Sequence, residues 1–272
     1  MAQHKIIYVS QEISPYLTAT DNARIGRSLP QAIQQKKYEV RTFMPDFGDI
    51  NERRNQLHEV IRLSGLSIVI GDNDHPLTVK VASMQPSRIQ VYFLDNDDYF
   101  EKEDTDTDAF GSNRADNDER IIFYAHATAE TARKLRWDPE IVHVSGWMSA
   151  LVPLYLKRLY QDGPSFKKTK IVYTIMPEAD VNGITENFFP YLKAEGVKPS
   201  DIKKFAGMPL DLKLLHKMAI AYSDAVTFHG VEPDPELLAY AEELGKPVKV
   251  YDGESDHADE YDELYKSLLP KA

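Results

Sequence analysis

Short apolar runs alternate along the chain with longer segments in which apolar side chains recur every three or four residues. The run at residues 6–9 is β-branched and aromatic, which is typical of a buried strand. Residues 22–37 carry apolar side chains at helical spacing, with Pro30 as an interruption. A second apolar run at residues 40–44 ends at Pro45. These segments predict one strand–helix–strand unit at the start of the chain.

The same alternation continues over the rest of the sequence. We expect further strands at residues 66–70, 79–82, 89–94, 141–144, 170–175, 225–228 and 248–251. We expect further helices at residues 117–135, 147–160, 210–221, 234–244 and 258–269. Residues 71–74 would close a hairpin, and residues 101–116 would form the least ordered loop. This alternation predicts an α/β fold with a doubly wound, mostly parallel sheet and helices on both faces.

We interpret residues 1–272 as a single domain that closes with a helix, a strand and a helix in 234–272. The last helix has an apolar stripe that we expect to pack back on the sheet, made of Tyr261, Leu264, Tyr265 and Leu268. Sheets of this kind bind ligands beyond the carboxyl ends of their strands. The segments expected at that edge are 10–21, 95–115, 145–150, 176–188 and 229–235.

Composition and charge exclude several classes of function. The 272 residues are 42% hydrophobic and 28% charged, which is typical of a globular protein. The absence of cysteine excludes disulfide scaffolds, thiolate catalysis and cysteine-bound zinc. A net charge of −11 argues against binding to nucleic acid. No run approaches the ~20 apolar residues of a spanning helix, and the start lacks a secretory pattern, so we expect a cytoplasmic protein without membrane contact.

Several motifs together resemble the bacterial glycogen and starch synthases, glycosyltransferase family 5. The matching segments, in family order, are KIIYVSQEISP (5–15), GRSLPQA (26–32), EVRTFMP (39–45), VYFLDNDDYF (91–100), DNDER (116–120), PEIVH (139–143), WMSALVPLYLK (147–157), VYTI (172–175) and YSDAVT (222–227). The resemblance covers roughly residues 5–230. Several segments in the right order are more specific than any single motif.

The resemblance implies the GT-B fold, in which two Rossmann-like domains face a cleft. Members of the family transfer glucose from a nucleotide sugar to the end of an α-1,4-glucan, and are about twice as long as this chain. The resemblance therefore covers the N-terminal domain alone, and unaided catalysis is not expected. ADP-glucose or UDP-glucose would bind only if the chain is active, and we expect no other cofactor and no metal.

The first phosphate-facing loop departs from the family pattern. The family has Lys-Thr-Gly-Gly there, because lysine offsets diphosphate charge and glycines let backbone N–H groups approach phosphates. This chain has Leu17-Thr18-Ala19-Thr20-Asp21 instead. We expect Asp21 to be the N-cap of the following helix rather than a ligand-binding residue.

Two further motifs have lost polar residues. The family sequence His-x-His-Asp-Trp is here His143-Val144-Ser145-Gly146-Trp147. The family sequence Tyr-Thr-Ile-His-Asn is here Tyr-Thr-Ile-Met176-Pro177. Scaffold residues between these positions match the family, which indicates relaxed demand on catalysis and continued demand on folding.

Other residues beyond the strand ends remain open to two interpretations. His143 and His229 either face a ligand or are buried, His143 with a hydrogen bond to the backbone. Glu12 and Glu178 are either a pair of reactive carboxylates or solvated or structural groups. The candidate sugar-binding residues are Tyr16, Thr18, Thr20, Asp21, His143, Ser145, Trp147, Glu178 and His229, of which Tyr16 and Trp147 would be stacking platforms or core.

Other known motifs do not account for the chain. The Asp104-x-Asp106-x-Asp108 run begins like a calcium loop, but alanines stand where its glycine and glutamate belong. No dinucleotide fingerprint, P-loop or nucleophile elbow is present. Three hypotheses remain: a catalytically degenerate α-glucan-binding or regulatory protein of glycogen metabolism, a glucosyltransferase completed by a partner chain, or a scaffold. In the last, a protein partner would cover the face that a second domain covers in the family.

Overall fold

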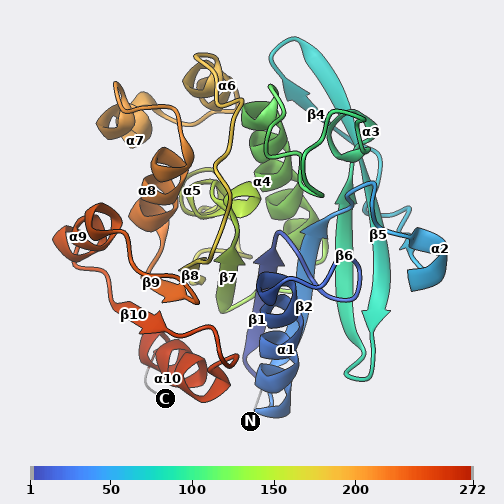
Figure 1. The fold of residues 1–272 in the computed structure, drawn as a ribbon, viewed down its shortest axis with the longest axis vertical. Coiled ribbons are helices and arrows are strands. Elements are labelled where there is room, and N and C mark those ends of the chain that lie inside the picture. The colour runs from blue at the N-terminus through green and yellow to red at the C-terminus, as the bar shows by residue number, and fades with distance from the viewer. Residues whose placement is uncertain (1–2, 271–272) are drawn as a thin grey trace.

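The computed structural model describes residues 3–270, which build one mixed sheet between two layers of helices (Figure 1). The strands are β1 (Lys5–Ser10), β2 (Glu39–Pro45), β3 (His58–Glu59), β4 (Leu66–Ile70), β5 (Asn73–Met84), β6 (Ile89–Asp95), β7 (Ile141–Ser145), β8 (Lys170–Ile175), β9 (Ala225–His229) and β10 (Val248–Tyr251). They lie in the order β10-β9-β8-β7-β1-β2-β6-β5-β3, and β4 pairs with β5. The strands from β10 to β6 are parallel, while β3, β4 and β6 pair with β5 antiparallel.

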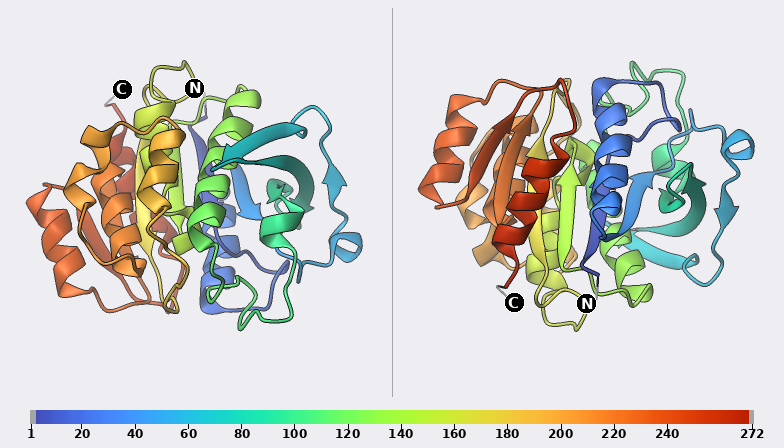
Figure 2. Two further views of the ribbon diagram at one scale, coloured as in Figure 1. Left: turned by 90° about the horizontal axis from the view of Figure 1, so that it is seen from above. Right: turned by 90° about the horizontal axis from the view of Figure 1, so that it is seen from below.

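Helices cover both faces of this sheet (Figure 2). The helical segments are α1 (Asp21–Gln35), α2 (Glu52–Asn55), α3 (Asp97–Phe100), α4 (Asn117–Lys134), η1 (Trp147–Ser149), α5 (Val152–Leu154), η2 (Tyr155–Leu159), α6 (Phe188–Ala194), α7 (Pro199–Ile202), η3 (Lys203–Phe205), α8 (Leu212–Tyr222), α9 (Pro235–Glu243) and α10 (Ala258–Leu268). α1 and α10 lie together on one face, and α4, α5 and α8 lie on the other. The doubly wound, mostly parallel fold expected from the sequence is therefore confirmed.

Strand order reverses between β1 and β7. From β1 the chain winds outward through β2 and β6, and it then returns to the other side of β1 and continues through β7, β8, β9 and β10. Such a reversal leaves the connections after β1 and β7 on opposite faces, so a crevice opens at their carboxyl ends. The paired register places Ser10 beside Ser145 at this edge.

Three local expectations need correction. The region 147–160 is not one helix but a 3-10 turn, a short α segment and a π-helical turn. Pro153 stands at the start of the α segment, where its missing N–H is tolerated, and it cannot continue the preceding turn. The hairpin strand β5 begins at Asn73, so the connection from β4 is only Gly71 and Asp72.

The third correction concerns residues 101–116, which have no helix or strand but are firmly anchored. Arg114 is buried and forms an ion pair with Asp106 at 2.7 Å, and it also donates to the backbone carbonyl oxygens of Tyr99 and Glu101. Asp108 accepts hydrogen bonds from the backbone N–H of Phe110 and from Ser112. A loop held by a buried guanidinium group is ordered, although its polar composition suggested the opposite.

The last helix packs on the sheet as expected. In α10, Tyr261, Leu264 and Tyr265 are buried, and the Tyr265 hydroxyl lies 3.0 Å from that of Tyr8 on β1. None of the helices in residues 3–270 is long and apolar enough to cross a membrane.

Candidate functional site

The connections after β1 and β7 lie against each other at the strand reversal. The backbone N–H of Gln11 donates to the Ser145 carbonyl oxygen, and the N–H of Met148 donates to Oε1 of Gln11. Gly146 has φ +91°, and a Cβ atom there would lie 2.5 Å from the Cβ of Gln11. Only glycine permits both this conformation and this close approach, so the position is fixed by packing.

The first turn of α1 is satisfied by side chains of the protein itself. Thr20, not Asp21, is the N-cap: its Oγ1 accepts from the Ala23 N–H at 2.9 Å and also donates to the Glu12 carboxylate. Asp21 is the first helical residue, and its side chain is 88% exposed. The expected cap is therefore wrong by one residue, and two carboxylates stand beside this helix start.

The start of the turn after β7 is capped by a third carboxylate. Oε1 of Glu178 accepts from the Trp147 N–H at 2.8 Å. Asn22, at the start of α1, donates through Nδ2 to the Pro177 carbonyl oxygen at 2.7 Å. These two bonds join the connection after β8 to the helices on both sides of the crevice.

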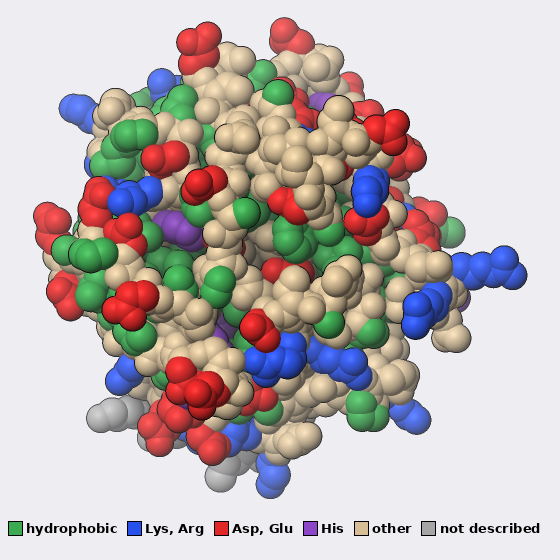
Figure 3. Space-filling model, viewed as in Figure 1, with side chains coloured by type: hydrophobic (Ala, Val, Ile, Leu, Met, Phe, Trp, Pro, Cys, Tyr) green, Lys and Arg blue, Asp and Glu red, His purple; other side chains and the backbone are tan. Residues whose placement is uncertain are grey.

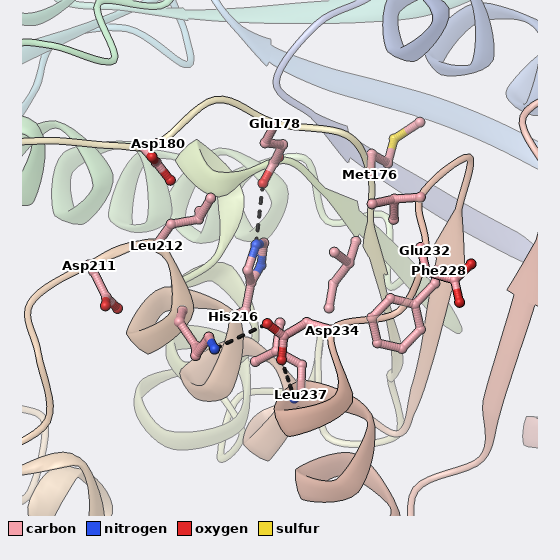
Figure 4. A pocket seen from close by; sticks show the side chains of 13 residues that line it. Met176, Glu178, Asp180, Asp211, Leu212, His216, Phe228, Glu232, Asp234 and Leu237 are labelled. Atoms are coloured by element: carbon pink, nitrogen blue, oxygen red, sulfur yellow. Dashed lines mark hydrogen bonds and ion pairs between the residues drawn. The ribbon is translucent and has the colours of Figure 1, made fainter.

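Beside this junction lies a cavity of about 330 Å³, here called the acidic cavity (Figure 4). It lies between the carboxyl ends of β8 and β9 and the first turns of α8 and α9. Its polar lining consists of Glu178, Asp180, Asp211, Lys213, His216, Glu232 and Asp234. Phe228 and Leu237 supply part of its apolar wall.

Glu178 and His216 face each other across this cavity (Figure 4). Oε2 of Glu178 lies 3.6 Å from Nε2 of His216, beyond hydrogen-bond distance, and this buried oxygen has no hydrogen-bond partner within residues 3–270. Nδ1 of His216 is 2.9 Å from the Tyr173 hydroxyl. Asp211 and Asp234 are the N-caps of α8 and α9, so their charges stabilise those helices.

Burial moves the pKa values of this pair in opposite directions. Burial raises the pKa of Glu178 to about 8, partly offset by the Trp147 N–H, and nearby Glu12 raises it further. Burial lowers the pKa of His216 to about 4. At neutral pH both side chains are therefore held mainly in their uncharged forms.

Comparison with known proteins identifies the family. The family described as starch synthase catalytic domain matches residues 5–236. The chain belongs to this family. The glycogen synthase of Chlorobium luteolum is 36% identical over 200 residues, which are 73% of this chain and 40% of that protein. The glycogen synthase of Pelodictyon phaeoclathratiforme is 38% identical over 172 residues, which are 63% of this chain and 35% of that protein.

A solved structure supports the same fold. The catalytic domain of Starch Synthase IV from Arabidopsis thaliana, bound to ADP and acarbose, aligns with a TM-score of 0.68 at 16% identity. The alignment covers 92% of this chain and 52% of that structure. The chain thus spans 40% or less of the two glycogen synthases and about half of the starch synthase domain.

In this starch synthase-type domain the two predicted histidines lie in the core. Nδ1 of His143 is 2.6 Å from the Tyr265 hydroxyl, and Nε2 is 2.5 Å from Oγ1 of Thr174. Burial lowers the pKa of His143 to about 3. His229 is also buried, with Nε2 at 3.0 Å from the Ser255 carbonyl oxygen and Nδ1 at 3.3 Å from the Tyr261 hydroxyl. Burial was one of the two expectations for His143, but its partners are side chains rather than backbone.

The predicted stacking rings are core residues. Trp147 is 2% exposed and Tyr16 is 6% exposed, and the Tyr16 ring packs edge-on against Phe93. Thr18 is exposed on the first loop, while Ser145 is partly buried, with its Oγ 3.4 Å from that of Ser10. The structure thus brings Thr20, Trp147 and Glu178 to the crevice and separates His143 and His229 from it.

Sequence reasoning also missed part of the site. The two glutamates were weighed as a reactive pair or as solvated or structural groups. Glu12 is 6% exposed and the Glu178 side chain is 4% exposed, so burial excludes only the solvated alternative. His216 was not considered, although its position among Leu214, Leu215 and Met218 on an apolar helix face was the available signal. Residues 3–270 contain no cluster of three or more His, Asp or Glu side chains arranged to hold a metal ion.

Proposed function

We propose that this domain binds α-glucan at its crevice and does not transfer glucose on its own, so that it serves glycogen metabolism as a binding or regulatory protein. The proposal rests on family membership for the glucan and on the local chemistry of the crevice for the missing transfer.

The proposal that the domain does not transfer glucose rests on one observation. Side chains of the protein itself cap both helix starts at the strand reversal. The first turn of α1 is served by Thr20 and flanked by the carboxylates of Glu12 and Asp21. The N–H of Trp147 is already bound to Glu178. Helix starts bind phosphates through free N–H groups and a positive potential. Here two of these N–H groups are already bound by side chains, and the nearby carboxylates oppose the positive potential. A nucleotide diphosphate is therefore disfavoured at this half of the cleft.

A neutral polyhydroxyl ligand meets a more favourable surface. Asp180 and Glu232 are exposed carboxylates of the acidic cavity, and carboxylate oxygens accept hydrogen bonds from sugar hydroxyl groups. Phe228 offers an apolar wall beside them. A sugar carries no charge, so the surplus of carboxylates does not repel it.

Neither His143 nor His216 is a proton donor or acceptor suited to neutral pH. His143 is buried under α10 with a pKa of about 3, and His216 is buried with a pKa of about 4. General acid–base catalysis is most effective when the pKa of the group lies near the working pH. These two histidines therefore serve the fold rather than a transfer reaction.

The test is a thermal-shift and transfer panel on the full chain. The ligands are maltoheptaose, ADP-glucose and UDP-glucose, and incorporation of labelled glucose into glycogen is measured in parallel. Maltoheptaose is expected to raise the unfolding midpoint, because a ligand bound only by the folded state stabilises it by mass action. The shift should shrink in Asp180→Asn and Glu232→Gln, and should persist in Glu242→Gln, the same type of change outside the cavity.

Each outcome decides between the hypotheses. Incorporation of labelled glucose by the chain alone would overturn the proposal and favour a transferase that needs no second chain. Absence of a maltoheptaose shift would reject glucan binding and favour a scaffold whose partner is a protein.

A further inference from the structure

A second cavity, of about 520 Å³, opens away from the acidic cavity. It lies between α1, the segment around α2 and β3, and the hairpin of β5 and β6. The polar side chains that line it are Arg27, Arg54, Asn55, Gln56, His58, Ser83, Gln85, Arg88 and Gln90, with Tyr16 at one end. We call it the basic cavity. Its volume is within the range of small-molecule sites.

The basic cavity has an uncompensated positive charge. Three arginines line it, and no aspartate or glutamate does. None of the ion pairs formed within residues 3–270 involves Arg27, Arg54 or Arg88. In a chain of net charge −11, such a cluster stands apart from its surroundings. Figure 3 shows Lys and Arg side chains gathered around α1 and near α2, while Asp and Glu dominate elsewhere on this face.

The nearest acidic residues along the chain are directed elsewhere. Glu52 is paired with Lys80 at 2.8 Å. Glu59 follows His58 in β3, and consecutive strand side chains point to opposite faces. His58 pairs with Val81, which also lines the cavity, so His58 faces the cavity and Glu59 faces away from it.

A backbone contact holds one of the three arginine side chains, that of Arg27. Nη2 of Arg27 donates to the Gln85 carbonyl oxygen at 2.8 Å, which fastens the β5–β6 turn to α1 and leaves most of its five N–H donors for other acceptors. Arg88 has φ +60°, a left-handed conformation that a long side chain rarely adopts, and its N–H donates to the Met84 carbonyl oxygen at 2.7 Å. Glycine suits this conformation, so the Arg88 side chain can be removed there without backbone strain.

We propose that the basic cavity binds the phosphate group of a small phosphorylated molecule. Guanidinium groups match phosphate oxygens with two parallel hydrogen bonds, which ammonium groups cannot do. The side-chain amides of Asn55, Gln56 and Gln90 are placed to bind hydroxyl groups of the rest of the molecule. Both a sugar phosphate and a nucleotide carry this group, and the experiment distinguishes them. The site is separate from the crevice and does not depend on its function.

The test is isothermal titration of the full chain with glucose 6-phosphate, ADP and inorganic phosphate, and with glucose as the uncharged comparison. The decisive variant is Arg88→Gly, because glycine relieves the left-handed backbone while removing the charge. We expect glucose 6-phosphate or ADP to bind, and the tighter of the two identifies the class. Arg88→Gly should weaken that binding at least tenfold without lowering the thermal midpoint, and Arg27→Gln should weaken it similarly.

Lys37→Gly is the matched control, since Lys37 is an exposed cation at φ +71° that lines neither cavity. It should leave binding unchanged. The proposal is overturned if no phosphorylated probe binds at millimolar concentration, if glucose binds as tightly as its phosphate, or if Arg88→Gly binds as tightly as the unmodified chain.

Discussion

Glu178 shows how one buried carboxyl group can couple stability to pH. One of its oxygens accepts the Trp147 N–H, and the other faces His216 without a hydrogen bond. Burial raises its pKa from 4.5 to about 8. Between these values the folded state holds a proton that the unfolded chain has released. The free energy of unfolding contributed by this group therefore falls as pH rises from 4.5 to 8.

Replacement of Glu178 by glutamine should remove this dependence. Glutamine keeps an oxygen for the Trp147 N–H and cannot ionise. Relative to the unmodified protein, Glu178→Gln should gain roughly 1–2 kcal/mol in free energy of unfolding between pH 6.5 and 8. Urea denaturation at each pH measures this difference. His216 does not confound it, because its lowered pKa acts below pH 6.5.

An exposed carboxylate of the same connection provides the control. Glu186→Gln should leave the pH profile parallel to that of the unmodified protein. A parallel profile for Glu178→Gln as well would show that Glu178 ionises at its ordinary pKa in the folded state.

At the scale of elements, α10 completes the polar interior of the sheet. Its two buried tyrosines reach across the ends of four strands. The Tyr265 hydroxyl contacts the Tyr8 hydroxyl and the ring of His143. The Tyr261 hydroxyl lies 3.2 Å from Oγ1 of Thr227. At the helix surface, Lys36, the C-cap residue of α1, pairs with Asp259. Without α10 the Tyr8 hydroxyl and Nδ1 of His143 would lose these partners, so the helix supplies hydrogen bonds as well as apolar cover.

Removal of one hydroxyl group measures that contribution. Tyr265→Phe should lower the free energy of unfolding by about 1–3 kcal/mol, because it leaves Tyr8 and His143 with unpaired buried groups. Tyr240→Phe on α9 is the matched change, since the Tyr240 hydroxyl is buried without a hydrogen-bond partner in the described chain. It should stay within about 0.5 kcal/mol of the unmodified protein. Equal losses in both variants in urea denaturation would contradict this assignment.

The strands and helices of this fold were predictable from the sequence where a local pattern of apolar residues specified them. The strands at 170–175 and 248–251 and the apolar stripe of α10 match the sequence-based expectation. In β8 the reason is burial on both faces, which requires a nearly continuous apolar run. The site was less predictable. Glu178 and His216 are separated by 38 positions along the chain and meet only when α8 packs beside β8, so no local pattern revealed the pair.

At the scale of the whole molecule, the protection of amide hydrogens against exchange should fall from the middle of the sheet to its edges. β1 and β7 are paired on both sides and buried, whereas β10 pairs only with β9 and leaves Val250 55% exposed. β3 has two residues, both exposed. Local opening costs little where few apolar contacts are broken.

Native-state hydrogen exchange measures this gradient. Amide hydrogens of β1 and β7 are expected to exchange only through global unfolding, and those of β10 and β3 at least tenfold faster. Equal protection of β10 and β1 would contradict the gradient and indicate that the β10 edge is covered in solution.

The contact between Tyr8 and Tyr265 has a consequence for biosynthesis. The two residues are 257 positions apart, yet their hydroxyl groups share a hydrogen bond. At roughly 5–20 residues per second, a ribosome needs about 13–50 seconds to go from one to the other. During that time the face of β1 that α10 will cover stays bare in the nascent chain. β1 is thus covered by α10 only late in synthesis of this sheet, and a chaperone that shields this face would act within that interval.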